Sequence, residues 1–101
     1  MPALPRRLKE ARLRAALSQE KLGIEAGLDP MSASARMNRY ELGKRIPDLA
    51  LVERIAKVLR LPTAYFYAVE DDEAELLIAF HELSSYDRAK AIAFVRGLRD
   101  S

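Results

Sequence analysis

The segment SASARMNRYELGKR, residues 32–45, combines forked hydrogen-bond donors with unusually small side chains. An arginine presents two parallel N–H donors that match O6 and N7 of guanine, and an asparagine can form the corresponding pair with adenine. Alanine can contact a thymine methyl group, and small side chains let a helix backbone come close to base edges. The candidates for such contacts are Ser34, Ala35, Asn38 and Arg39, with Arg39 the strongest.

Helical phase separates these residues from those that must hold the segment in place. At about 100° per residue, the side expected to pack against the protein holds Ala33, Met37, Tyr40 and Glu41. The opposite side and its flanks hold Ala35, Arg39, Leu42, Ser34, Asn38 and Arg36. Phase alone is compatible with a solvated face or a binding face, and the side-chain chemistry favours binding. For Asn38, a hydrogen bond within the turn is a strong alternative.

Elsewhere in the chain, helical spacing recurs and strand-like alternation does not, which predicts an all-α protein. Ser18 and Asp48 are typical N-cap residues. Gly27 is expected in a left-handed conformation after the second helix. The expected helices of the first part cover residues 5–16, 19–26, 32–42, 49–60 and 62–68.

The charge distribution divides the chain at the acidic stretch VEDDEAE. Residues 1–69 contain 13 Lys and Arg against 7 Asp and Glu, a net charge of +6, whereas residues 70–101 contain 4 against 8, a net charge of −4. A basic first part suits a polyanionic partner, which would repel the second part. The sequence therefore predicts a binding domain at 1–69 followed by a separate element at 70–101.

Residues 70–101 contain two more amphipathic segments, 72–83 and 85–98, separated by two serines. We expect an α-hairpin, which is too small to be stable without a partner surface. Its apolar stripes make it the predicted dimerisation element, with contacts from Leu76, Leu77, Phe80, Ile92 and Val95.

Composition argues against several other classes of protein. The chain has 101 residues, no cysteine and a single histidine, so a metal site or a catalytic triad is not expected and no cofactor is indicated. No apolar run approaches the roughly 18 residues of a membrane span, and the start MPALPRRLKEARLR does not resemble a signal peptide. We expect a non-enzymatic protein of a reducing compartment, the cytoplasm.

The spaced motifs LSQEKL, AG, ExGKRxPD and IAxxL, within about residues 6–66, resemble the Cro/C1-type (XRE-family) helix-turn-helix of bacterial and phage repressors. The resemblance implies a five-helix, lambda-repressor-like DNA-binding domain, here followed by the α-hairpin. One feature departs from the family pattern: Gly27 and Glu41 lie 14 positions apart, so the turn before the recognition helix is longer.

The resemblance also assigns roles to individual residues. It implies that 34, 35, 38 and 39 face the major groove, and that an ion pair between Arg12 and Glu41 ties the first helix to the third. Backbone phosphates are expected to be contacted by Ser18, Gln19, Arg36, Lys44 and Arg45. Arg36 is compatible with either a base or a phosphate contact, and phosphate is favoured.

The leading hypothesis is a sequence-specific transcriptional regulator, a repressor by default, that binds a palindromic operator in double-stranded DNA as a homodimer. An alternative is an antitoxin or anti-regulator whose main role is to hold a partner protein. An apolar surface on 72–98 that the homodimer leaves unused would favour that alternative.

Overall fold

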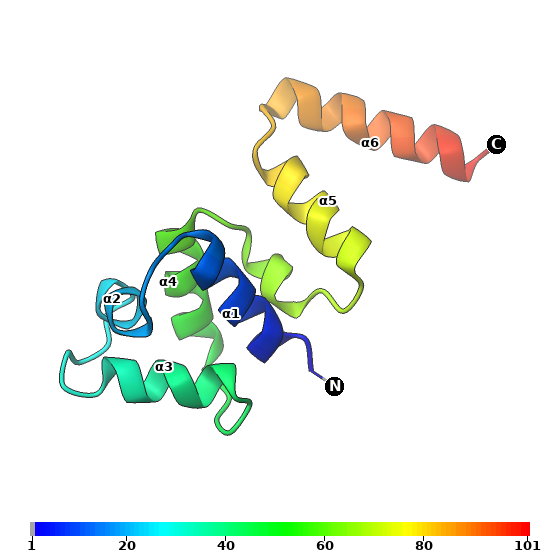
Figure 1. Ribbon diagram of the computed structural model, residues 1–101. Coiled ribbons are helices and arrows are strands. Elements are labelled where there is room, and N and C mark those ends of the chain that lie inside the picture. Colours follow the sequence, from blue (N-terminus) through cyan, green and yellow to red (C-terminus); the bar gives the residue numbers. More distant parts are fainter. Residues whose placement is uncertain (1) are drawn as a thin grey trace.

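The computed structural model describes residues 2–101, and Met1, the first residue of the predicted domain 1–69, lies outside the described residues. The described chain contains helices and no strand, which confirms the prediction of an all-α fold (Figure 1). The elements are α1 (Leu4–Arg14), α2 (Gln19–Glu25), α3 (Ala33–Glu41), α4 (Leu49–Leu59), η1 (Thr63–Tyr67), α5 (Asp71–His81) and α6 (Ser85–Arg99).

Local capping explains where several of these helices begin and end. The Ser18 hydroxyl accepts from the Lys21 amide at 3.0 Å, and Asp48 Oδ1 accepts from the Leu51 amide at 2.8 Å, so both predicted N-caps are confirmed. Gly27 follows α2 with φ +94°, as expected.

The short helix predicted at 62–68 is present as the 3₁₀ helix η1. The amide of Tyr65 donates to the Pro62 carbonyl at 3.0 Å, and the amide of Ala68 donates to the Tyr65 carbonyl at 3.2 Å. These are three-residue spacings, which define a 3₁₀ turn and are common in connectors.

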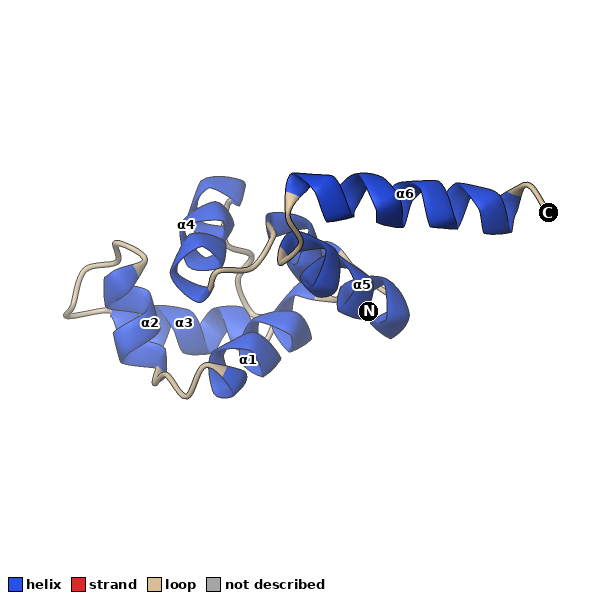
Figure 2. Cartoon of the chain, turned by 90° about the horizontal axis from the view of Figure 1, so that it is seen from above, coloured by secondary structure: helices blue, strands red, loops and turns tan. Residues whose placement is uncertain are grey.

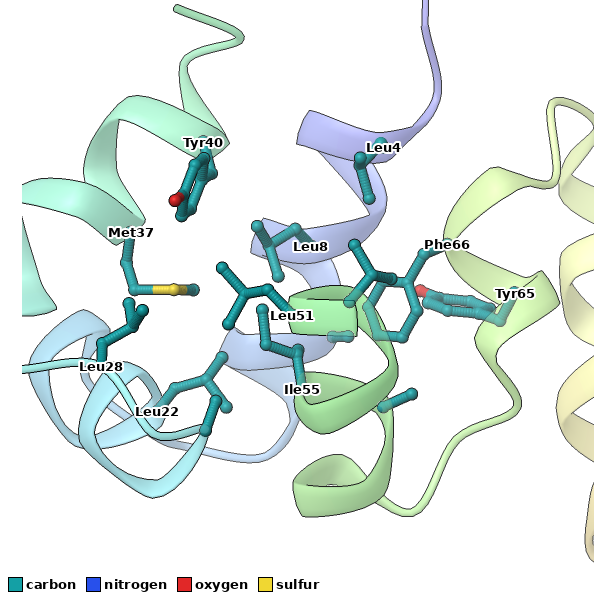
Figure 3. Packing of buried hydrophobic residues seen from close by; sticks show 14 of the residues in the cluster. Leu4, Leu8, Leu22, Leu28, Met37, Tyr40, Leu51, Ile55, Tyr65 and Phe66 are labelled. Atoms are coloured by element: carbon teal, nitrogen blue, oxygen red, sulfur yellow. The ribbon is translucent and has the colours of Figure 1, made fainter. Parts of the chain in front are cut away.

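The core lies where α1, α2, α3, α4 and η1 converge (Figure 3). Each of these elements contributes a side chain that is at most 1% exposed: Leu8, Leu22, Met37, Ile55 and Phe66. Burying an aliphatic or aromatic side chain of this size contributes about 1.5–3 kcal/mol. The first five elements therefore form one packed unit that can hold α3 in a fixed orientation.

Gly23 permits a close approach between α2 and α3. A Cβ built at Gly23 would lie 2.9 Å from the Cβ of Ala33 and 3.1 Å from Cγ of Met37. The Ala33 Cβ is attached directly to the backbone, so it can move away only if α3 moves.

We therefore expect Gly23→Ala to lower the free energy of unfolding by about 1–3 kcal/mol, the usual cost of overpacking. The matched control is Gly97→Ala in α6, where an added Cβ meets nothing within 4 Å. That change should raise stability by up to about 1 kcal/mol, because alanine is the better helix former. Urea unfolding at equal protein concentration measures both, and a stabilised Gly23→Ala variant would contradict the close approach.

The last two helices leave this unit as an arm (Figures 1 and 2). α5 packs on η1 and buries Ala74, whereas α6 has no buried residue. The radius of gyration is 15.4 Å, above the value of about 13 Å for a compact chain of this length. The two C-terminal helices are thus present within two residues of their predicted bounds, and they form a hairpin whose helices diverge as an open V (Figure 1).

Arg88, in the first turns of α6, holds the apex of this V. Its Nε donates to the Phe80 carbonyl at 3.1 Å and its Nη2 donates to the His81 carbonyl at 2.9 Å. Its guanidinium also lies 5.1 Å from the centroid of the Phe80 ring. Because these carbonyls belong to the last turn of α5, Arg88 satisfies that helix end and sets the direction in which α6 leaves.

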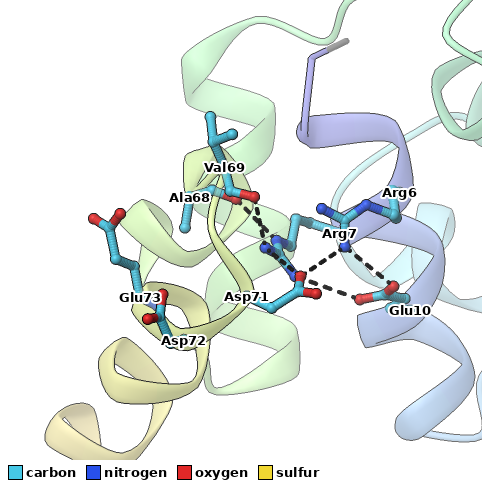
Figure 4. Close-up of polar contacts among 8 residues, drawn as sticks. All are labelled: Arg6, Arg7, Glu10, Ala68, Val69, Asp71, Asp72 and Glu73. Carbon is cyan, nitrogen blue, oxygen red and sulfur yellow. Dashed lines mark hydrogen bonds and ion pairs between the residues drawn. The ribbon is translucent and has the colours of Figure 1, made fainter.

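A buried arginine attaches the arm to α1 (Figure 4). Arg7 is 3% exposed, and it donates to the carbonyls of Ala68 at 3.0 Å and Val69 at 3.3 Å. Its Nη2 also lies 3.0 Å from Oδ1 of Asp71, which accepts a hydrogen bond from Arg6 at the same distance. The segment that leads into α5 is therefore fixed to α1 through both backbone and side-chain contacts.

The pKa of Asp71 is lowered, first by the hydrogen bond from Arg6 and then by that from Arg7. A carboxyl with a lowered folded-state pKa stabilises the fold above its unfolded pKa and loses that effect as the pH falls through the folded value. This contact is consequently intact at neutral pH. Asp71 is exposed, so solvent screening keeps its contribution small.

Candidate nucleic-acid interface

The burial of α3 follows the predicted helical phase. Ala33, Met37, Tyr40 and Glu41 are at most 9% exposed. The side chains on the other side of the helix are exposed: Ser34, Ala35, Asn38, Arg39 and Leu42. The four candidate base-contacting residues are therefore brought together on one open face, and Arg36 is half-buried at its flank.

The end of α3 directs two further cations toward the same region. The Gly43 amide donates to the Tyr40 carbonyl at 3.1 Å, and the Lys44 amide donates to the Arg39 carbonyl at 2.9 Å. This is the Schellman pattern, which needs a left-handed residue, and Gly43 supplies it with φ +74°. Lys44 and Arg45 are exposed directly beyond this turn.

An ion pair between Arg12 and Glu41 holds the end of α3 against α1. Arg12 Nε lies 2.6 Å from Oε2 of Glu41 and Nη2 lies 2.9 Å from Oε1, a bidentate arrangement with only 3% of the Glu41 side chain exposed. Arg12 Nη1 also donates to the Leu17 carbonyl at 3.0 Å, which adds the segment before α2. Because Glu41 accepts these hydrogen bonds, the pKa of Arg12 is raised above its ordinary value.

Gln19 extends this polar network to the exposed face. Its Nε2 donates to Oε1 of Glu41 and to Oδ1 of Asn38, both at 3.2 Å. Asn38 is thus partly engaged within the protein, by a residue of α2 instead of one within the turn. Its amide N–H groups remain as donors, and one lone pair of its oxygen is already used. The hydrogen bond between Gln19 and Asn38 therefore positions two candidate contacts at once. Gln19 is predicted to contact a phosphate, and Asn38 is predicted to contact a base.

Three arginines meet at the other flank of α3. Arg36, Arg39 and Arg45 line a hollow of about 150 Å³ together with Tyr40. Arg36 Nη2 donates to the Tyr40 hydroxyl at 2.8 Å, and its guanidinium lies 5.9 Å from the centre of that ring. Within the described chain, Arg39 forms no ion pair and no side-chain hydrogen bond, so its donors are free to bind a ligand.

The start of α2 presents a second candidate contact. Ser18 uses an oxygen lone pair to cap the helix, so its hydroxyl hydrogen can still donate to an anion. The N-terminus of α2 carries partial positive charge in the same place. The Ser18 hydroxyl and the Gln19 backbone N–H are therefore suitably placed for a phosphate oxygen. The Gln19 side chain is not, because both of its N–H donors already bind Glu41 and Asn38.

The longer turn between α2 and α3 is an ordered loop. Leu28 is 6% exposed and belongs to the core. Asp29 Oδ1 accepts from the Met31 amide at 2.8 Å, and its carbonyl accepts from the Ser32 amide at 3.0 Å. Arg54 of α4 closes the other end, since its Nε donates to the Ala26 carbonyl at 2.7 Å. The extra residues thus form a surface loop that leaves the phase of α3 unchanged.

Residue type and spacing did not identify two arginines that have structural roles, Arg7 and Arg54. Arg7 stands beside the exposed Arg6, and nothing in their types distinguishes them. The only signal for Arg7 is its position one residue before Leu8 on the buried side of α1. No comparable signal marks Arg54, whose partner is a backbone carbonyl 28 residues away.

The five predicted dimerisation residues line one groove between α5 and α6. The groove has a volume of about 360 Å³, and its walls are Glu73, Leu76, Leu77, Phe80, Ala91, Ile92, Val95 and Arg96. Leu76 and Val95 are more than half exposed.

Residues 2–101 contain neither a cluster of metal-ligating side chains nor a helix that could span a membrane. No group of three or more His, Asp or Glu side chains is close enough to hold a metal ion. None of the described helices combines the length and the apolar character that a membrane span requires.

These features define a helix-turn-helix protein with an exposed, cationic third helix. A family model described as a helix-turn-helix domain matches residues 3–65, and the chain belongs to this family. The fold is similar to the crystal structure of the transcriptional regulator BswR, with a TM-score of 0.85, 41% sequence identity and coverage of 93% of each chain. No curated protein matches the sequence.

Proposed function

We propose that this protein is a sequence-specific transcriptional regulator of the Cro/C1 type that binds double-stranded DNA as a homodimer. The observation that carries the proposal is the division of α3 into a buried side and an exposed side that bears Asn38 and a free Arg39. The similarity to a transcriptional regulator at 41% identity over 93% of both chains agrees with it.

The proposed mode of binding places the exposed face of α3 in the major groove. Arg39 reads a guanine through its forked donors, with Ser34, Ala35 and Asn38 contacting neighbouring bases. Phosphate contacts on the two flanks set the register. They come from Ser18 and Gln19 at the start of α2 on one side, and from Arg36, Lys44 and Arg45 on the other.

A dimer is proposed because one recognition helix reads only a few base pairs. Two copies related by a twofold axis read a palindrome whose half-sites lie about 34 Å apart. The exposed apolar groove between α5 and α6 supports the arm as the dimerisation element, and the net charge of −4 on residues 70–101 keeps the arm away from the phosphates. Occupation of an operator blocks polymerase, so repression is the proposed outcome.

Selection of bound sequences from random double-stranded DNA tests the proposal directly. We expect enrichment of a palindrome with two half-sites one helical turn apart. Absence of any enriched sequence would reject sequence-specific binding and favour the function of holding a partner protein.

Arg39→Ala should weaken binding to the selected operator by about 1–3 kcal/mol, or roughly 5- to 150-fold, and relax the base preference at one position in each half-site. The physical reason is the loss of a bidentate contact to guanine, which Arg39→Lys should not restore. Affinities measured by fluorescence anisotropy at fixed salt give the result.

The control for charge alone is Arg14→Ala, which removes an exposed arginine next to the arm, away from α3. It should reduce affinity only slightly and leave the base preference unchanged. If Arg39→Ala binds the operator as tightly as the unmodified protein, the proposed register of α3 is wrong.

A further inference from the structure

The groove between α5 and α6 is preformed in a single chain. Arg88 fixes the angle of the V through hydrogen bonds to the Phe80 and His81 carbonyls and by stacking on the Phe80 ring. Ile92 remains 41% exposed and Val95 52% exposed on the α6 wall. The structure thus holds open an apolar surface that its own helices do not cover.

The apolar side chains of α6 spread over more of its circumference than one neighbouring helix can cover. On a helical wheel with about 100° per residue, five apolar side chains of α6 span an arc of about 160°. In order around the helix they are Phe94, Leu98, Ala91, Val95 and Ile92. The core-facing apolar stripe of an amphipathic helix is usually about 100° wide or somewhat wider, so the stripe of α6 is broad. Among the described residues, α6 has no buried side chain, and Phe94, Val95 and Leu98 are all more than half exposed. A helix from outside the chain could cover them.

Charge indicates which helix that is. The first turn of α5 is acidic and the last turn of α6 is basic. Glu73 of α5 and Arg96 of α6 both line the groove, and neither forms an ion pair within the described residues. An incoming helix that is apolar in the middle and basic near its end therefore fits against α5, and α6 of a second copy has this pattern.

We propose that two copies of the chain form an intertwined dimer in which α6 of each copy packs against α5 of the other. Glu73 of each copy pairs with Arg96 of the other, and Ile92 and Val95 fill the groove of the opposite copy. The two contacts are equivalent by twofold symmetry, so each copy supplies both a groove and the helix that fills it. This arrangement rests on the homodimer of the proposed function and specifies how its two arms meet.

Exchange of charges between copies tests this arrangement. Glu73→Arg and Arg96→Glu each place two like-charged pairs in a homodimer, so each variant alone should weaken dimerisation by about 10- to 100-fold. In an equimolar mixture, the arginine introduced at position 73 of one copy meets the glutamate introduced at position 96 of the other, and the second pair is the native one. The mixture should therefore form heterodimers with an affinity near that of the unmodified protein, measured by sedimentation and by native mass spectrometry.

Two variants control for general effects of charge on the helices. Asp72→Arg changes the same first turn of α5, and Lys90→Glu changes the same helix α6, but neither residue lines the groove. Both should leave the dimer intact, alone and in mixtures.

The other outcomes overturn the proposal in distinguishable ways. If the single variants are monomeric and the mixture stays monomeric, Glu73 and Arg96 act within one chain. Single variants that dimerise normally place the dimer interface elsewhere, which leaves the proposed homodimer standing. Were the unmodified protein monomeric while still selecting a DNA sequence, both the intertwined arm and the proposed homodimer would be rejected, but base recognition would not.

Discussion

Glu41→Ala should lower the free energy of unfolding by about 3–5 kcal/mol, the cost of leaving one partner of a buried ion pair alone. Only 10% of the Arg12 side chain and 3% of the Glu41 side chain are exposed, so solvent cannot replace the lost carboxylate. Gln19 loses an acceptor through the same change. Urea unfolding followed by circular dichroism measures the loss.

The double variant Arg12→Met with Glu41→Leu removes both charges of the ion pair, so it leaves no unpaired charge in the buried site. Apolar residues that replace both partners of a buried pair are often neutral or stabilising, so this variant should recover much of the stability. Its α3 should nevertheless bind the operator less tightly, since Gln19 then has only Asn38 as a partner. A loss below about 1 kcal/mol in Glu41→Ala would show that the pair is hydrated and contributes little.

Ile92→Asp combined with Val95→Asp should abolish dimerisation and reduce operator affinity by about 100-fold or more. A dimer binds its second half-site as an intramolecular event, which typically raises affinity by about 10²–10⁴. Charged side chains in the apolar groove remove that advantage without any change on α3. Sedimentation gives the oligomeric state, and fluorescence anisotropy gives the affinity.

The fold of the DNA-binding unit should survive this double variant, because α6 contributes no buried residue. The matched control is Ala89→Asp with Ala93→Asp, which adds the same charges to exposed positions that do not line the groove. That control should remain dimeric. Persistence of a tight dimer in the Ile92 and Val95 variant would exclude the arm as the dimerisation element.

The connection between the arm and α1 bears on how two half-sites are presented. Arg7 ties the backbone carbonyls of Ala68 and Val69 to α1, and Asp71 joins the same contact from the start of α5 (Figure 4). If the arms join two copies, this attachment determines the direction of each recognition helix relative to the dimer axis. The spacing of the half-sites then depends on Arg7, a buried arginine that lies outside α3.

Much of the candidate site follows from local rules that a sequence can express. Ala33, Met37, Tyr40 and Glu41 are buried because the helical period puts them on one side, and Arg39 is exposed for the same reason. N-caps at Ser18 and Asp48 and the left-handed Gly27 involve residues only a few positions apart. Helix period and capping act over one or two turns, so residue type and spacing are sufficient to predict them.

Other features depend on contacts between residues far apart in the chain. The hydrogen bond from Gln19 to Asn38 spans 19 positions, and that from Arg7 to Ala68 spans 61. Periodicity gives the face on which a side chain lies, but it carries no information about the partner that reaches it. This is why the sequence left the engagement of Asn38 open and did not separate Arg7 from Arg6.

The arrangement of α5 and α6 likewise combines local features that the sequence predicts with an angle that depends on tertiary contacts. Sequence alone determined two amphipathic helices, their bounds to within two residues, and the apolar positions Leu76, Leu77, Phe80, Ile92 and Val95. Only the tertiary structure decided that these helices stand apart, because the angle depends on Arg88 reaching the last carbonyls of α5. An apolar stripe predicts that one face of a helix will be buried. The geometry of the turn between α5 and α6 decides whether the other helix of the same chain can bury that face.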